Sequence, residues 1–179
     1  MLGSDFLAAV RKAMPDRDEL EDYGLDDEEI DAIQGTFSSR GRVAKPSPEE
    51  SASELERMIL ENDCSTIEIG LVRFLERPQP HSHGVAVAYC EADMIVVRAD
   101  GIVSLYDHAA PATVAMECAA SSEAFLDGLA AFVEIRAKKS DWAGRPALAA
   151  QHCSAQAGGS AYIDFFATLC GFLMEIRAD

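Results

Sequence analysis

The pair Asp100-Gly101 constrains the fold of this chain more than any other short feature. It stands between two apolar, β-like runs at residues 94–98 and 102–106. Asp-Gly is one of the few dipeptides that adopt the positive φ angles of a two-residue type I′ turn at low cost, and such a turn joins neighbouring antiparallel strands. The sequence therefore predicts an antiparallel hairpin here, which argues against the parallel sheet of a Rossmann-type fold.

Further short strands surround the hairpin, and helices flank the strands on both sides. We expect strands at residues 66–69, 71–75, 85–89 and 113–117, with a proline-containing loop at 78–84. Apolar residues at helical spacing predict helices before and after this region, and the aromatic residues of the last helix are more typical of a core than of a ligand site. The predicted class is α+β: a mostly antiparallel, twisted sheet of about five or six strands over residues 66–118, packed by N-terminal and C-terminal helices.

The chain of 179 residues fits one structural domain with an N-terminal extension. We divide it into an acidic helical segment at 1–63, which includes a loop at 38–48, and an α+β part at 64–179. Within the first segment, Asp26 and Glu29 have the spacing of a capping box. Ser47 followed by a proline predicts the start of another helix.

The charge is strongly negative and is concentrated near the N-terminus. The chain has 31 acidic and 15 basic residues, and residues 16–31 alone hold ten acids and one base, a net charge of −9. Such a field repels nucleic acid and anionic membranes and attracts basic proteins. We expect a basic protein partner, no nucleic acid and no membrane; the alternative is an acidic face that only maintains solubility. The candidate partner-binding residues are Asp18, Glu19, Glu21, Asp22, Asp27 and Glu28.

The five cysteines are odd in number, widely spaced and set in apolar stretches. These settings favour reduced thiols that act as small hydrophobes, with neither disulfides nor a zinc site. The N-terminus lacks the pattern of a signal peptide, and no uncharged apolar run reaches the roughly 18 residues that a membrane span needs. We therefore expect a cytoplasmic protein.

Few residues indicate catalysis or metal binding. The chain contains no phosphate-binding glycine motif, no nucleophile elbow and no zinc-protease motif, so we expect no cofactor and no catalytic residues. His81 and His83 are weak candidates for two metal ligands in the 78–84 loop, with Asp107 or His108 as a third. Loop histidines are more often simply solvated.

A second group of acids lies at predicted strand ends. Glu91 and Asp93 stand close to the start of a strand, and Asp107 follows the end of another. Paired carboxylates of this kind can act as a general acid and base. Acids at strand ends also commonly accept hydrogen bonds from backbone N–H groups in turns.

The order of features over residues 67–132 resembles the SUKH superfamily, a group of α/β domains common among bacterial immunity proteins. The resemblance rests on the strand near Tyr89, the hairpin at Asp100-Gly101, a strand ending near Cys118, and a helix after it. The helix from Ser122 to Leu129 resembles the family pattern S-x-E-x-F-L-x-x-L. This resemblance implies a protein that binds and neutralises a toxin domain.

Three hypotheses for function follow. The first is a non-enzymatic binding module of the SUKH immunity type, for which an acidic surface would suit a basic toxin domain because charge complementarity speeds association. The second is a small metal-dependent or hydrolytic enzyme that uses His81, His83 and the strand-end acids. The third is a general acidic adaptor or assembly subunit.

Overall fold

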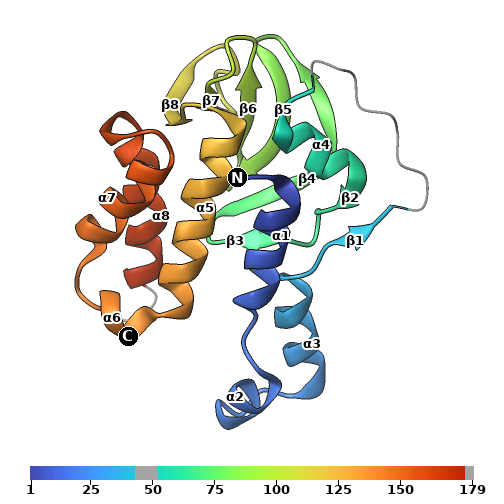
Figure 1. Ribbon diagram of the computed structural model, residues 1–179, viewed down its shortest axis with the longest axis vertical. Coiled ribbons are helices and arrows are strands. Elements are labelled where there is room, and N and C mark those ends of the chain that lie inside the picture. Colours follow the sequence, from blue (N-terminus) through green and yellow to red (C-terminus); the bar gives the residue numbers. More distant parts are fainter. Residues whose placement is uncertain (43–51, 176–179) are drawn as a thin grey trace.

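The computed structural model describes residues 1–42 and 52–175 and shows a mixed α and β fold (Figure 1). Its centre is a six-stranded sheet in the order β3-β4-β5-β6-β7-β8, with all neighbouring strands antiparallel. The predicted α+β class and antiparallel meander are confirmed. The strands are β3 (Glu68–Ile69), β4 (Val72–His81), β5 (Gly84–Cys90), β6 (Asp93–Arg98), β7 (Val103–Tyr106) and β8 (Val114–Ala119); a separate two-stranded sheet pairs β1 (Arg40–Gly41) with β2 (Asn62–Asp63).

The predicted hairpin joins β6 to β7, but its turn is longer than expected. The N–H of Arg98 donates to the carbonyl of Ile102 at 2.9 Å, and this bond closes a three-residue loop over residues 99–101. Gly101 has a φ of +88°, whereas Asp100 does not have a positive φ. The Asp100 carboxylate accepts the N–H of Ile102 at 3.2 Å, a local contact that favours ordinary turn geometry at Asp100. The strand pairing is confirmed, and the two-residue type I′ turn is wrong.

Strand β4 continues through most of the segment that we expected to be a loop at 78–84. Pro80 pairs with Val85 and His81 with Gly84, which leaves only residues 82 and 83 in the turn. Proline is tolerated there because β3 pairs only with the first two residues of β4, so the rest of β4 forms the edge of the sheet. A Cβ atom on Gly84 would lie 2.1 Å from the carbonyl oxygen of Val97, so the close strand approach requires glycine.

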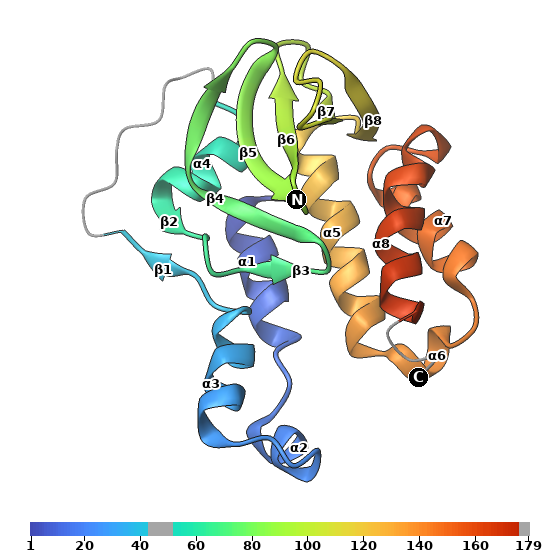
Figure 2. The same cartoon turned by 180° about the vertical axis from the view of Figure 1, so that it is seen from behind.

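Helices cover one face of the sheet. Helices α1, α4 and α5 pack there, and α7 and α8 lie beside α5 (Figures 1 and 2). None of the described helices is long and apolar enough to cross a lipid bilayer. These elements are α1 (Gly3–Lys12), α4 (Glu54–Glu61), α5 (Ser122–Ala137), α7 (Pro146–Gln156) and α8 (Ile163–Glu175), with a short α6 (Lys139–Trp142) and a 3-10 turn η1 (Ser160–Tyr162) between them.

One continuous apolar core joins the N-terminal helices, the sheet and the C-terminal helices. Phe6 of α1 contacts Phe74 of β4 with ring centroids 5.9 Å apart. Phe125 of α5 contacts Phe165 of α8 at 5.8 Å, and Phe166 is fully buried. Phe165 and Phe166 of the last helix therefore belong to the core, as their spacing predicted.

Capping boxes define two of the helix starts. Asp26 accepts the N–H of Glu29, and Glu29 returns the contact at the start of helix α3 (Asp27–Gly35), which confirms that prediction. Ser53 and Glu56 form the same arrangement at the start of α4. The helix start predicted at Ser47 lies outside the described residues, as does part of the loop expected at 38–48.

All five cysteines are free and buried. Burial raises the pKa of Cys64 to about 12 and that of Cys90 to about 11. Burial also raises the pKa of Cys118. Because the thiolate is the reactive form, these side chains behave as small hydrophobes rather than as nucleophiles.

Replacing Gly101 by alanine should lower the free energy of unfolding by about 1–2 kcal/mol, because an L residue is strained at positive φ. No atom lies within 4 Å of the added Cβ, so the loss reports backbone strain alone. Gly35 provides a matched control, since its φ is not in the positive range and its Cβ position is equally open. Gly35→Ala should be neutral or stabilising in urea unfolding; equal destabilisation by both changes would contradict the proposed turn.

The native protein should react slowly with an aqueous thiol reagent, and five thiols should react once it is denatured. The reason is that burial shields all five sulfur atoms and, at Cys64, Cys90 and Cys118, also raises the thiol pKa and so suppresses thiolate formation. Spectrophotometric thiol titration with and without denaturant measures both quantities. Fewer than five thiols in the denatured protein would mean that some cysteines are oxidised.

Candidate functional site

The acidic segment forms an arm, defined here as residues 16–35, that extends from one end of the molecule (Figures 1 and 2). It contains α2 (Arg17–Asp22) and α3, each with one buried apolar residue, Leu20 and Ile30. The arm is anchored at its end: the N–H of Glu68 in β3 donates to the carbonyl of Thr36, and Phe37 joins the main core. The side-chain amide of Gln34 also donates to the carbonyl of Pro15.

Arg17 compensates part of the arm's charge. Its guanidinium contacts Glu21 at 3.3 Å, Asp31 at 3.0 Å and Asp27. Hydrogen bonds to Asp27 and Asp31 raise the pKa of Arg17 above its ordinary value. This single cation therefore ties α2 to α3, although the contacts are solvent-exposed and individually weak.

Five of the ten acids in the arm have no such partner. Three contact Arg17 and two form the capping box of α3. Among the described residues, no ion pair or side-chain hydrogen bond involves the other five, which are all exposed: Asp16, Asp18, Glu19, Asp22 and Glu28. The predicted partner-binding residues thus divide into two groups, since Glu21 and Asp27 are held by Arg17 while Asp18, Glu19, Asp22 and Glu28 remain available.

A groove of about 800 Å³ separates α2 from the C-terminal end of α5, and we call it the α2–α5 groove. Its walls combine polar and apolar side chains, with more polar than apolar surface open to solvent, and Tyr23 at its side is 70% exposed. Two of the unpaired acids stand at the groove as well. The lining residues are Lys12, Ala13, Met14, Pro15, Asp16, Glu19, Leu20, Tyr23, Ile33, Phe37, Val133, Arg136 and Ala137.

Arg136 brings a cation into this groove. Its guanidinium carbon lies 5.6 Å from the centre of the Phe37 ring, a cation–π contact. Burial lowers the pKa of Arg136, and the charge of Glu68 acts in the opposite direction. Glu68 is itself paired with Arg73. The sequence analysis did not identify Arg136, because its position on the last turn of an apolar helix gives no sign of what faces it.

His81 and His83 lie against Tyr106. The two histidine rings are 4.8 Å and 5.1 Å from the Tyr106 ring, centre to centre, and 5.7 Å from each other. Tyr106 is only 2% exposed and belongs to a small cluster of buried residues with Leu75, Ala86 and Val96. Burial, followed by the neighbouring His83, lowers the pKa of His81. The two histidines therefore pack over an aromatic ring, and the backbone N–H of His83 also donates to Nδ1 of His81 at 3.3 Å.

The two residues suggested as a third metal ligand instead meet Asp93. The N–H of His108 donates to Asp93 at 3.0 Å, and the ring Nδ1 of His108 lies 2.6 Å from the same oxygen. Asp107 accepts the N–H of Ala109 at 2.7 Å. Donor atoms of Asp93, Asp107 and His108 lie within 4.8 Å of one another. Because both aspartates accept backbone N–H groups, this cluster has a structural function in the β7–β8 connection.

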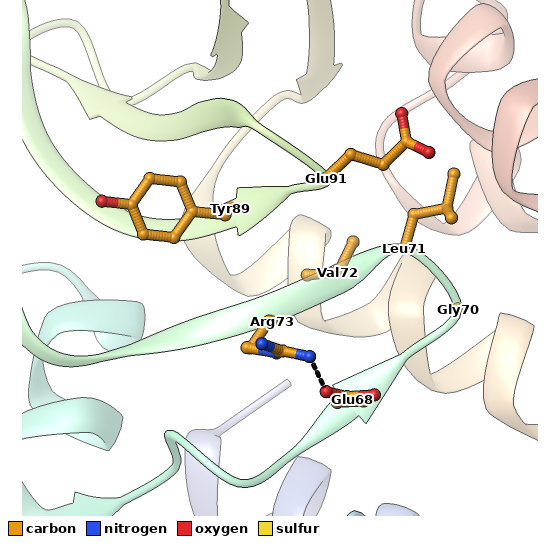
Figure 3. A pocket seen from close by; sticks show the side chains of 7 residues that line it. All are labelled: Glu68, Gly70, Leu71, Val72, Arg73, Tyr89 and Glu91. Atoms are coloured by element: carbon orange, nitrogen blue, oxygen red, sulfur yellow. Dashed lines mark hydrogen bonds and ion pairs between the residues drawn. The ribbon is translucent and has the colours of Figure 1, made fainter. Parts of the chain in front are cut away.

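A smaller pocket lies between β3, β4 and the β5–β6 turn (Figure 3). Arg73 is paired with Glu68, whereas Tyr89 and Glu91 point in different directions from this pair and from each other (Figure 3). Glu91 has a φ of +54°, in the region that costs a non-glycine residue about 1 kcal/mol or more. The side chains do not converge on one point, so they do not form the acid and base pair of a catalytic site.

Asparagine in place of Asp93 should lower the pKa of His108 towards its ordinary value of 6.5. The carboxylate raises the pKa of His108, and the N–H and ring of His108 lower the pKa of Asp93 below 3.8. Because its pKa is raised on folding, His108 stabilises the fold at pH values below its unfolded pKa, and this stabilisation is lost as the pH rises through its folded pKa. Because its pKa is lowered on folding, Asp93 stabilises the fold at pH values above its unfolded pKa, and this stabilisation is lost as the pH falls through its folded pKa. NMR titration of the histidine rings tests this, with Asp100→Asn as a control, and an unchanged His108 pKa in Asp93→Asn would contradict it.

Comparison of the chain with protein-family models, with curated proteins and with solved structures finds no match. We therefore infer function from the residues and geometry described above.

Proposed function

We propose that this protein is a non-enzymatic protein-binding module that captures a basic protein through its acidic arm. The observation that carries this proposal is the set of five exposed, unpaired acids of the arm. One directly precedes α2, three lie on α2 and one lies on α3. Like charges gathered on one surface repel one another and oppose the compact state, so a sequence that serves stability alone would be expected to disperse them. A basic partner offsets this repulsion.

The surroundings of the acids favour a protein as the partner. The α2–α5 groove places apolar side chains and the exposed Tyr23 directly beside Asp16 and Glu19. Protein interfaces combine an aromatic or apolar centre with a charged rim that steers association. Nucleic acid is disfavoured by the sign of the charge.

We further propose that the partner is a toxin domain and that the protein acts as a SUKH-type immunity protein in the bacterial cytosol. The support is the resemblance over residues 67–132 and the presence of its elements in the fold. The hairpin at Asp100-Gly101, the strand that contains Cys118 and the helix after it occur in the expected order. A basic nuclease toxin would be attracted by the arm's charge.

Partner identification followed by association kinetics tests both parts of this proposal. Affinity purification from the native host should yield a basic toxin domain. The variant Asp18→Asn/Glu19→Gln/Asp22→Asn/Glu28→Gln should then associate with it more slowly, by several-fold to about tenfold at low salt, with the difference shrinking as salt is raised. Its dissociation rate should change little, and its stability should be equal or higher because repulsion is relieved.

A matched control separates the arm from total charge. Glu76→Gln/Glu91→Gln/Glu134→Gln/Asp164→Asn removes four exposed carboxylates outside the arm. It should keep a faster association rate than the arm variant at every salt concentration. Equal rates for wild type and both variants would show that the arm is only a solvated face, and an acidic partner or a turned-over substrate would refute the proposed function.

A further inference from the structure

Arg136 is a partly buried cation whose charge is not neutralised by the rest of the described chain. Among the residues whose side chains the structure describes, no ion pair or hydrogen bond of its guanidinium occurs; its contact is the ring of Phe37. The anion whose charge reaches it, Glu68, is held by Arg73. Removing a charge from water without a partner is unfavourable, and a cation–π contact offsets only part of that cost.

The groove around Arg136 determines which anion would fit. Two bases, Lys12 and Arg136, and two acids, Asp16 and Glu19, line it, so the charges of the lining sum to zero. A phosphate dianion would be repelled by the two acids and would find one partly buried guanidinium. A single carboxylate matches one guanidinium fork in both charge and geometry.

The apolar part of the wall offers a place for an apolar group beside the carboxylate. Leu20, Phe37 and Val133 are buried at the groove, and Tyr23 stands exposed at its side. An apolar side chain inserted here would remove further apolar surface from water. An acidic residue or C-terminal carboxylate adjacent to an apolar side chain has both features.

We propose that the α2–α5 groove binds a segment of the protein partner in which a carboxylate stands next to an apolar side chain. The carboxylate pairs with Arg136, the apolar side chain lies against the groove wall beside Tyr23, and basic residues around the segment face Asp16 and Glu19. This inference rests on the proposed function and specifies its interface. In this arrangement the acids of the arm increase the rate of association, and Arg136 lowers the rate of dissociation.

Small probes test the groove without the partner. N-acetyl-leucine carries the carboxylate and the apolar side chain, and N-acetyl-leucinamide lacks only the charge. In ¹⁵N NMR titrations, N-acetyl-leucine should shift the amides of Tyr23, Ile33 and residues 133–137 and should bind about tenfold or more tightly than the amide, because a hydrogen bond to a charged group is stronger than a neutral one. Equal binding of the two probes, or shifts elsewhere on the molecule, would overturn the inference.

Variants then assign the selectivity to Arg136. Arg136→Met should reduce binding of N-acetyl-leucine to the level of the amide, and Arg136→Lys should keep a preference for the carboxylate. Arg57→Met, which removes an exposed arginine on α4, should bind as wild type does. The same spectra report whether each variant is folded. Unchanged selectivity in a folded Arg136→Met protein would refute the assignment.

Kinetics with the identified partner distinguish this inference from the proposed function. Arg136→Met should raise the dissociation rate by about tenfold or more and leave the salt dependence of association unchanged. An unchanged dissociation rate overturns the inference while leaving the steering function of the arm intact. If the four-acid arm variant associates like wild type but the probes retain their selectivity, the proposed function fails and the carboxylate site stands.

Discussion

The burial of α5 is the packing constraint on which the rest of the structure depends. Ten of its sixteen residues are buried, so the helix is covered on nearly every side. A helix that is apolar around most of its circumference requires partners in several directions. The sheet and α4 cover one side, α1 covers another, and α7 and α8 complete the enclosure. The helices that follow α5 are therefore part of the core, since Phe165 of α8 packs against Phe125, and Phe166 lies against Gly128.

The same helix connects the core to the candidate interface. Its interior residues are held by this packing, and its last turn carries Arg136 into the α2–α5 groove opposite the arm. The arm itself contributes little apolar burial, with Leu20 and Ile30 as its buried residues and Arg17 as its electrostatic tie. The C-terminal end of the well-packed helix α5 thus lies across the groove from the arm, which is strongly charged and more lightly packed. Binding surfaces commonly combine a scaffold of this kind with segments of low local stability.

The acids of the arm divide into those that have partners within the chain and those that do not. Sequence composition identified the acidic segment as unusual, yet it could not divide the ten acids by their contacts. Arg17 reaches Asp27 and Asp31 only because α2 folds back beside α3, which brings residues 10 and 14 positions apart within hydrogen-bonding distance. The capping box, by contrast, was readable, because its partners are three residues apart within one helix. The sequence also did not reveal that Asp16 lines the groove or that Arg17 links α2 to α3, because both features depend on contacts between residues that are far apart in the chain.

By itself, the sequence determined the features that depend on short-range geometry: the antiparallel pairing across Asp100-Gly101, the capping box at Asp26, and the burial of Phe165 and Phe166 in the last helix. Each follows from interactions among residues close in the chain or from a periodic apolar pattern. Only the tertiary structure decided that β4 runs through Pro80, because edge position rather than local propensity makes proline tolerable there. It also decided that Arg136 lines the same groove as Asp16 and Glu19 of the arm. That juxtaposition joins residues more than a hundred positions apart, and only the packing of α1 and α5 brings them together.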